Sequence, residues 1–281
     1  MNKQNMMSCK KFSNIKKKDI RLEIELNHYK PTLVVIQVDE HPASNTYIKG
    51  KEEDCKDVGI EMIHIKIDST QVSQKELCHI VSMYGQDDNV DGIIVQLPIP
   101  KKYNIKEILK YIPPEKDVDG FRKDSLFNAC TPKGIIDWLT YNNYYFKGKN
   151  VVVLGRSEIV GKPLVNMLID KGATVICCNS KTGFYSRLKY FEFADMVISA
   201  IGNPKFFNCC DVGINAKILI DVGMNKDEHG QLCGDIDPDG FDKFKPNTYV
   251  TPVPGGVGLL TRTALIDNVL QAHKHKIKGE D

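Results

Sequence analysis

Tyr47 and Lys51 lie one helical turn apart and could together bind and process one ligand. Side chains four positions apart project from the same face of an α-helix. Tyr47 offers an aromatic surface for a planar heterocycle, and a partly desolvated Lys51 would have a lowered pKa that suits proton transfer. The same spacing is common in ordinary surface pairs, so the pair alone leaves both interpretations open.

Gln96 is a polar residue in the otherwise apolar run GIIVQLPIP. A buried amide needs hydrogen-bond partners, which leaves a bond to Lys51 or an amide satisfied at the strand end. A bond to Lys51 would restrain the amine without adding a counter-charge. The next loop, KDVDGF, contains Asp117 and Asp119, and one of these carboxylates could accept hydrogen bonds from a ligand.

A second candidate site is the segment GRSEIVGKP, in which Gly155 ends an apolar run and Gly161 begins a helical one. Such a turn can direct the amides of the helix N-terminus at a phosphate. It differs from the GxGxxG fingerprint, and it is not an ATP-binding phosphate loop because Pro163 follows Lys162. The segment is therefore either a variant dinucleotide site or a tight turn without a ligand.

The end of the following strand indicates which dinucleotide would bind. An NAD-specific fold usually presents an acid to the ribose hydroxyls at this point, whereas this chain has Asn179, Ser180 and Lys181. Ser180 and Lys181, with Arg156, could hold a 2′-phosphate through charge-assisted hydrogen bonds. We therefore predict NADP rather than NAD, the alternative being that Lys181 is a solvated loop charge.

Two further glycine segments follow apolar runs. They are AIGNP, which contains Gly202, and DVGMN, at residues 221–225. Cofactors of open α/β sheets bind outside the carboxyl ends of the strands, so both segments are expected to help enclose the dinucleotide. A simple strand-ending turn is the alternative for each.

The pattern of apolar residues predicts two α/β units that position these residues. In the first, apolar runs of strand length cover residues 32–38, 62–67 and 92–97, and helical stretches cover 43–58 and 72–84. Strands that alternate with helices in this way predict a βαβαβ unit. Gly59 is placed to end the first helix in a left-handed conformation.

The second unit begins after a loop at residues 112–121 and a helix at 132–145. Its predicted strands cover residues 151–154, 174–177, 195–200 and 217–222, and a helix covers 160–171. The segment 252–258, rich in glycine and proline, precedes an amphipathic C-terminal helix.

Composition limits the class of protein. The 281 residues, 42% of them hydrophobic, can bury two cores, and a net charge of +2 gives no reason to expect nucleic-acid or membrane binding. The nine cysteines have no metal-ligand spacing, which favours a reducing compartment and no metal. No apolar run approaches the roughly 18 residues of a membrane span. A soluble, cytoplasmic protein is therefore expected.

The N-terminal segment is rich in lysine and allows two interpretations. It is either an organellar targeting segment or an N-terminal helix packed on the domain, and the absence of an apolar signal core favours the helix. The residues expected to pack are Ile15, Ile20, Leu22, Ile24 and Leu26.

Ten segments in order, between about Pro31 and Ala272, resemble the bifunctional methylenetetrahydrofolate dehydrogenase/methenyltetrahydrofolate cyclohydrolase family. These are HPASNTYIKGKEEDCKDVGI, DGIIVQLPIP, KDVDGF, CTPKGI, VVVLGRSEIVGKPL, NSKT, ADMVISAIGNP, DVGMN, GDID and TPVPGGVG. The resemblance implies NADP-dependent oxidation of 5,10-methylenetetrahydrofolate to 5,10-methenyltetrahydrofolate, and hydrolysis of that product to 10-formyltetrahydrofolate.

The resemblance also implies an architecture. Two α/β domains flank a cleft, and members of the family are typically homodimers. The folate-binding catalytic domain would comprise residues 1–125 and 259–281, with the C-terminal helix returning to it, and the Rossmann-like NADP-binding domain would comprise residues 126–258.

The resemblance assigns roles to particular residues. Lys51 would be the catalytic lysine, tuned by Gln96, while Tyr47 would stack on the folate and Asp119 would bind its pterin. The same cleft would be shaped by Ser44, Pro254, Gly255 and Gly256. The dinucleotide would be bound by Thr131, Gly155, Arg156, Ser157, Ile159 and Ser180.

The chain departs from the family pattern at several points. The segment between Gly120 and Cys130 is shorter than usual, Arg122 stands where histidine is common, and Leu259 and Leu260 replace a Pro-Met pair. These changes flank the predicted cleft, so a homologue that binds folate and dinucleotide without turnover is an alternative. An unrelated NADP dehydrogenase is a third possibility, but it would leave the residues around Lys51 unexplained.

Overall fold

The computed structural model describes residues 7–208, 211, 216–237 and 248–279. The chain forms two compact units, which we name by their sheets. The three-stranded unit comprises the described residues of Asn14–Cys130 and Arg262–Asp281, and the five-stranded unit those of Met1–Ser13 and Thr131–Thr261. Within these described segments, no helix is both long and apolar enough to cross a membrane.

The three-stranded unit is built on the predicted βαβαβ pattern. Its elements are β1 (Thr32–Val38), α2 (Pro42–Val58), β2 (Glu61–Ile67), α3 (Gln74–Gly85) and β3 (Gly92–Gln96). The strands are parallel and lie in the order β2-β1-β3. All seven residues of β1 are buried, as expected for the central strand of a parallel sheet covered on both faces.

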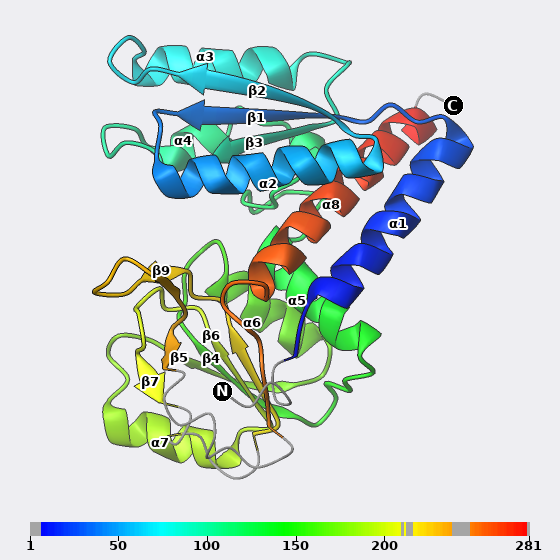
Figure 1. Ribbon diagram of the computed structural model, residues 1–281. Helices are drawn as coiled ribbons and strands as arrows, with labels where there is room; N and C mark the ends of the chain where they lie inside the picture. Colours follow the sequence, from blue (N-terminus) through cyan, green and yellow to red (C-terminus); the bar gives the residue numbers. More distant parts are fainter. Residues whose placement is uncertain (1–6, 209–210, 212–215, 238–247, 280–281) are drawn as a thin grey trace. The chain divides into compact units, whose positions relative to one another are not determined.

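Alternate residues of β1 serve two hydrophobic cores. Leu33 and Val35 belong to the core that contains α2 and the part of α8 (Val257–Gly279) that lies in this unit. Val34 and Ile36 belong to the core that contains α3 and α4 (Ile105–Leu109). Figure 1 shows α2 and α3 on opposite sides of this sheet. The predicted return of the C-terminal helix to the first sheet is confirmed.

The ends of α2 follow from local sequence. Pro42 occupies the first turn, where its missing N–H costs no hydrogen bond. Gly59 has φ 88° and donates its N–H to the Cys55 carbonyl oxygen at 3.0 Å, which confirms the predicted left-handed cap. The helix that carries the candidate catalytic residues is therefore fixed at both ends.

The N-terminal helix α1 (Lys10–Asn27) is present, but its packing differs from the prediction. Ile20 and Ile24 are buried, whereas Leu22 and Leu26 are 43% and 78% exposed, and Ile15 is also exposed. Residues four apart share a helix face and residues two apart do not, so only one pair of these side chains reaches the core. The expectation that all five residues pack was wrong.

The first described residues also belong to a different unit from the one predicted. Residues 7–13 were assigned to the first domain, whereas they lie in the five-stranded unit. Cys9 and Phe12 are buried in a core of that unit, and Met7 N–H donates to the Val250 carbonyl at 2.9 Å. The unit boundaries at 130/131 and 261/262 lie slightly beyond the predicted 125/126 and 258/259.

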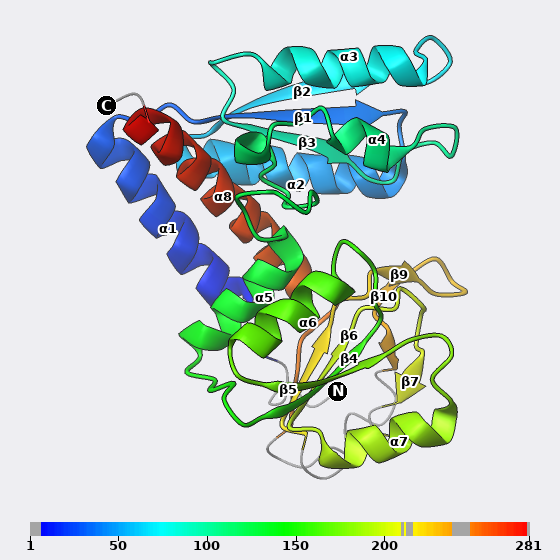
Figure 2. The same ribbon diagram turned by 180° about the vertical axis from the view of Figure 1, so that it is seen from behind.

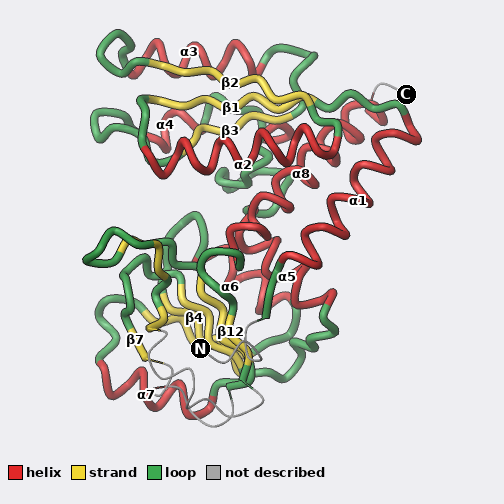
Figure 3. Tube along the Cα trace, viewed as in Figure 1, coloured by secondary structure: helices red, strands yellow, loops and turns green. Residues whose placement is uncertain are grey.

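The five-stranded unit contains a wholly parallel sheet in the order β12-β8-β6-β4-β5. Figure 3 draws strands in yellow. Its strands are β4 (Asn150–Leu154), β5 (Thr174–Cys178), β6 (Met196–Ser199), β8 (Ile218–Asp221) and β12 (Tyr249–Val250). After β4 the chain moves outward to β5 and then returns past β4 to β6. The gap between β4 and β6 is therefore the topological switch point, where open α/β sheets bind ligands.

Helices cover both faces of this sheet (Figure 2). One core contains residues of α5 (Cys130–Tyr141) and α6 (Gly161–Asp170), and the other contains Phe191 of α7 (Phe184–Phe193). Four short strands stand outside the sheet: β7 (Phe207–Asn208) pairs with β11 (Ile236–Asp237), and β9 (Asn225–Lys226) pairs with β10 (Leu232–Cys233). This architecture confirms the predicted two-domain α/β fold with a Rossmann-like second domain.

Candidate active site

Lys51 is a buried amine with one defined hydrogen-bond partner. Its side chain lies on α2, the residue is 8% exposed, and Nζ donates to Gln96 Oε1 at 2.9 Å. Gln96 ends β3, and its Nε2 donates to the Leu97 carbonyl at 2.7 Å. That second bond fixes the amide so that its oxygen faces Lys51, which is the first of the two arrangements that the sequence left open.

Burial shifts the titration of Lys51 and of the neighbouring Asp119 in opposite directions. Desolvation lowers the pKa of Lys51, and the positive charge of Arg262 lowers it further, while Asp119 opposes this. Desolvation raises the pKa of Asp119, and Lys51 opposes that shift. Burial therefore weakens the charged form of each group, which suits a role in proton transfer.

Tyr47 and Ser44 lie on the preceding turns of α2. Tyr47 is partly exposed, and burial of the remainder raises the pKa of its hydroxyl. Ser44 is buried and its Oγ lies 3.4 Å from the Leu97 carbonyl that also accepts from Gln96. One carbonyl thus ties the first turn of α2 to the end of β3.

The two carboxylates of the KDVDGF loop have different roles. Asp117 is fully buried, and its Oδ2 accepts from the Arg122 N–H at 2.8 Å, so it holds the loop. Asp119 is the carboxylate that interacts with Lys51. At Gly120, with φ 69°, an added Cβ would lie 2.5 Å from the Ala129 nitrogen, so the short segment after the loop closes tightly.

Arg262 belongs to this site and was missed in the sequence. Its Nε lies 3.1 Å from Asp54 Oδ2, and Asp54 also pairs with Lys17 Nζ at 3.0 Å. A Cβ at Gly50 would overlap the Arg262 guanidinium, which therefore lies against the backbone of α2 between Tyr47 and Asp54. A glycine inside a helix was the available signal, because it often marks a close approach.

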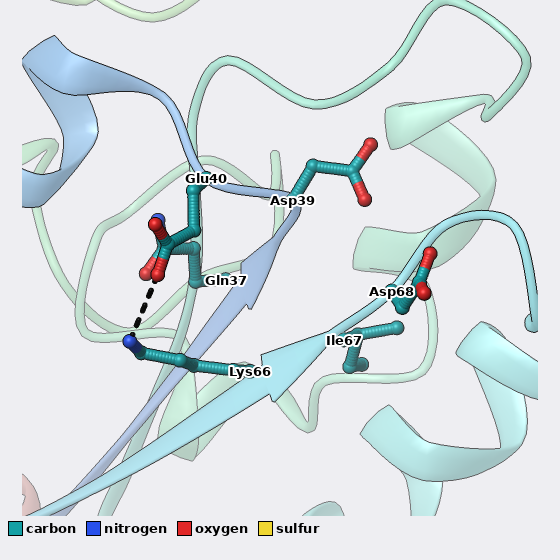
Figure 4. Close-up of a pocket in the computed structure, with 6 residues that line it drawn as sticks. All are labelled: Gln37, Asp39, Glu40, Lys66, Ile67 and Asp68. Carbon is teal, nitrogen blue, oxygen red and sulfur yellow. Dashed lines mark hydrogen bonds and ion pairs between the residues drawn. The ribbon is translucent and has the colours of Figure 1, made fainter.

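A separate cavity of about 340 Å³ opens at the carboxyl ends of β1 and β2 (Figure 4). It is lined by Gln37, Asp39, Glu40, Lys66, Ile67 and Asp68, none of which was predicted as a site residue. The single lysine is paired with Glu40 at 3.0 Å. Three carboxylates against one paired amine make this cavity unsuitable for an anionic ligand.

The Gly155 turn lies at the topological switch point. Gly155 has φ 106°, and a Cβ there would overlap the Ala200 carbonyl of the loop after β6. A Cβ at Gly161 would overlap the Gly155 carbonyl, so both positions require glycine. Ser157 Oγ accepts from the amides of Val160 and Gly161, both at 3.2 Å, and thereby closes the turn at the start of α6.

The side chains predicted to select NADP lie at the same edge of the sheet. Arg156 follows β4, and Ser180 and Lys181 follow the neighbouring β5; all three are exposed. Lys181 N–H donates to Asn179 Oδ1 at 2.9 Å, which orders the loop. No ion pair involves Arg156 or Lys181 within the described segments.

The remaining predicted cofactor residues belong to the same unit. Gly202, with φ 72°, lies on the loop after β6, and Ile159 is partly buried in the Gly155 turn. Thr131 Oγ1 and Thr261 Oγ1 lie 2.9 Å apart at the start of α5.

The turn predicted to help bind folate is in the five-stranded unit. Gly255 has φ 96°, and a Cβ at Gly256 would overlap the Pro252 carbonyl. Pro254 precedes them and is exposed. Ser44, Tyr47 and Lys51 are in the three-stranded unit.

Comparisons with known proteins match both domains, and the matched ranges differ from the two compact units at residues 7–13 and 262–277. Residues 7–119 match the model of the tetrahydrofolate dehydrogenase/cyclohydrolase catalytic domain, and residues 129–277 match that of the corresponding NAD(P)-binding domain. The bifunctional protein FolD of Bacillus mycoides is 41% identical over 282 residues, covering 97% of this chain and 96% of that protein.

Solved structures of dehydrogenase/cyclohydrolases are similar to this chain over nearly its whole length. The bifunctional FolD methylenetetrahydrofolate dehydrogenase/cyclohydrolase of Campylobacter jejuni is 33% identical, with a TM-score of 0.86 over 94% of this chain and 96% of that one. The Trypanosoma brucei dehydrogenase-cyclohydrolase, solved with NADP and an inhibitor, is 27% identical, with a TM-score of 0.88 over 97% and 98% of the two chains. This chain therefore belongs to the tetrahydrofolate dehydrogenase/cyclohydrolase family.

Proposed function

We propose that this enzyme oxidises 5,10-methylenetetrahydrofolate with NADP and hydrolyses the resulting 5,10-methenyltetrahydrofolate to 10-formyltetrahydrofolate. The observation that carries the proposal is the buried Lys51, which bonds to Gln96 and interacts with Asp119. A buried amine of lowered pKa, next to a side chain that can stack on a heterocycle, suits proton transfer on a planar substrate.

The hydrolysis needs a base and no redox partner. The methenyl carbon is already electrophilic, so water must be placed and lose a proton as it attacks. The tetrahedral adduct then collapses: the bond from this carbon to N5 breaks, the hydroxyl proton passes to N5, and the formyl group stays on N10. The neutral Lys51 amine takes this proton, and the Gln96 oxygen holds the amine in position at 2.9 Å and stabilises the ammonium that forms. Tyr47 stacks on the folate, Ser44 shapes the pocket around it, and Asp119 accepts hydrogen bonds from the pterin.

The oxidation depends mainly on alignment of two rings. NADP, when bound, supplies the hydride acceptor. The Gly155 turn fits a pyrophosphate, because Gly155 and Gly161 form a tight turn without side chains and the N-terminus of α6 follows. The exposed side chains of Arg156, Ser180 and Lys181 fit the 2′-phosphate, with Thr131, Ser157, Ile159 and Gly202 as further cofactor residues.

The residues from Pro254 to Gly256 also bind folate in this proposal.

We place the enzyme in the cytoplasm as a homodimer. No disulfide joins the cysteines that the structure describes, which suits a reducing compartment. Burial of Ile20 and Ile24 supports a structural role for the helix α1. Light scattering of the purified protein measures the oligomeric state.

The test is a turnover assay with the purified chain. Reduced-nicotinamide absorbance is followed on mixing methylenetetrahydrofolate with NADP or NAD, and decay of methenyltetrahydrofolate is followed separately. The proposal expects reduction of NADP in preference to NAD, and methenyl decay faster than in buffer. Binding of NADP without either turnover would replace it with the non-catalytic homologue.

A further inference from the structure

We propose that Asp235 is a positioning residue for the dinucleotide. Hydrogen bonds to its buried carboxylate hold the loop after β6 in the conformation that binds the cofactor. The inference rests on the proposed function, since it assumes that NADP binds at the switch point between β4 and β6. It assigns a role to the GDID and DVGMN segments that the mechanism above does not use.

Asp235 is completely buried, and five groups donate hydrogen bonds to its two oxygens. The donors are the Ser199 hydroxyl (2.8 Å), the backbone N–H groups of Ile201 (2.9 Å), Gly202 (3.3 Å) and Asn203 (3.0 Å), and the Asn225 side-chain amide (2.9 Å). Three successive amides that converge on one anion form the kind of concavity that often binds a phosphate. Here the protein's own carboxylate occupies it, so these amides shape the loop instead of contacting the cofactor.

A second buried carboxylate, Asp221 at the end of β8, holds Asp235 in place. Its Oδ1 accepts from the N–H groups of Gly223 at 2.9 Å and Asp235 at 3.0 Å, and its Oδ2 accepts from Ile236 at 2.9 Å. A Cβ at Gly223 would overlap the Asp235 carboxylate, and a Cβ at Gly234 would overlap that of Asp221. The glycines of both segments therefore make room for the two carboxylates.

Burial disfavours the ionised form of Asp221. Burial raises the pKa of Asp221 to about 6, and the charge of Asp235 adds to this shift. Among the residues that the structure describes, neither carboxylate forms an ion pair with a lysine or arginine. Buried charges without a counter-charge are poor sources of stability, so a role in shaping the loop accounts for them better than stability does.

The gathered loop lies directly against the cofactor turn. Leu154 of β4 is in register with Ser199 of β6, and Gly155 approaches the Ala200 carbonyl too closely to allow a side chain. A shift of residues 200–203 would therefore move the Gly155 turn or open a gap beside it. The hydrogen bonds of Asp235 thus fix one wall of the dinucleotide site.

The experiment replaces Asp235→Asn in the full chain and measures both reactions together with direct titration of NADP. The carboxamide introduced at this position would turn an NH2 group toward amide donors. We expect the NADP dissociation constant and the KM for NADP to rise by about tenfold. Hydrolysis of methenyltetrahydrofolate, which needs no dinucleotide, should stay within about twofold of the parent.

Asp227→Asn is the matched control. Asp227 is a partly exposed carboxylate of the β9–β10 hairpin that accepts hydrogen bonds from the N–H groups of His229 and Gln231, at 2.9 and 2.8 Å. Its replacement should leave NADP binding unchanged. If Asp235→Asn does not fold, the double variant Ser199→Ala, Asn225→Ala removes two of the five donors and should still weaken NADP binding selectively.

A lower melting temperature with unchanged NADP affinity would show that Asp235 is only structural and would overturn the inference. Equal losses of NADP affinity and of hydrolysis would do the same. Failure of the proposed function is a different result, because the parent protein itself would then lack NADP-dependent oxidation or NADP binding.

Discussion

The Lys51 site and the Gly155 turn differ in which parts of the protein would contact the ligand. At Lys51 the working groups are side chains that are buried, hydrogen-bonded to one another and shifted in pKa before any ligand arrives. At Gly155 the contribution of the protein is mainly backbone shape, and Arg156, Ser180 and Lys181 stand exposed around it. Proton transfer needs a group whose charge state is tuned by burial, whereas phosphate recognition needs room and accessible donors.

This contrast implies that substitutions at the two sites reduce different activities. A change at Lys51 removes a proton acceptor while leaving the dinucleotide site whole. A change at the turn removes a shape that only the dinucleotide uses. The two activities of this enzyme report the two sites separately, since hydrolysis involves no hydride transfer.

The largest difference between loss of hydrolysis and loss of oxidation is expected for Lys51→Met. Loss of the proton acceptor should slow methenyl hydrolysis by about a thousandfold, within the usual range for a general base, and slow the oxidation far less. Lys49→Met is the control, because Lys49 is exposed on the same helix. Steady-state rates of both reactions measure the difference, and hydrolysis preserved in Lys51→Met would remove this residue from the mechanism.

Gly155→Ala should produce the reverse pattern. The new Cβ meets the Ala200 carbonyl at a residue with φ 106°, so the turn must distort. We expect NADP-dependent oxidation to fall by about a hundredfold and unfolding free energy by about 2 kcal/mol. Gly183→Ala is the matched control in the same unit, because nothing lies within 4 Å of its added Cβ. Equal behaviour of the two variants would contradict a role for the tight turn.

The exposed side chains of the turn should affect only the choice of cofactor. In the double variant Arg156→Ala, Ser180→Ala, loss of charge-assisted hydrogen bonds should lower kcat/KM for NADP by about ten- to a hundredfold and leave that for NAD nearly unchanged. Lys171→Ala, at the far end of α6, controls for loss of one exposed positive charge. Equal losses with NAD and NADP would show that these residues do not read the 2′-phosphate.

Much of this contrast could be predicted from sequence. The run TLVVIQV matched β1 to the residue, because a fully buried strand is rich in apolar and β-branched residues. Helical spacing placed Tyr47 and Lys51 on one face, and an isolated amide in an apolar strand led to Gln96. In each case the prediction used only residues close together in the sequence.

Other features depend on contacts between segments distant in sequence. The helix FYSRLKYFEF was missed because it buries only Phe191 and has no apolar stripe. The pairing of β7 with β11 involves strands of two residues, too short for any period. The carboxylates of Asp221 and Asp235 were unassigned for a related reason, since their partners are backbone amides brought together only by folding.

Substitution of Arg262 should have the smallest effect on the rate, and it tests specifically how charge sets the pKa of Lys51. Its positive charge lowers the pKa of Lys51, while Asp119, Cys130 and Cys55 act in the opposite direction. Removal of the charge in Arg262→Leu should therefore raise the Lys51 pKa. The base is active only when neutral, so the rate of hydrolysis increases with pH through this pKa, and that limb of the profile should move to higher pH.

At neutral pH the Arg262→Leu variant should hydrolyse methenyltetrahydrofolate about two- to fivefold more slowly, the size expected for a partly exposed charge interaction. Arg262→Lys keeps the charge and should keep the profile, even though it loses the planar contact with Asp54. A limb that moves equally in both variants would mean that Arg262 acts through packing against Gly50. An unmoved limb in Arg262→Leu would mean that the charge of Arg262 does not set the titration of Lys51, and the contrast with the exposed cations of the Gly155 turn would then rest on desolvation rather than on this neighbouring charge.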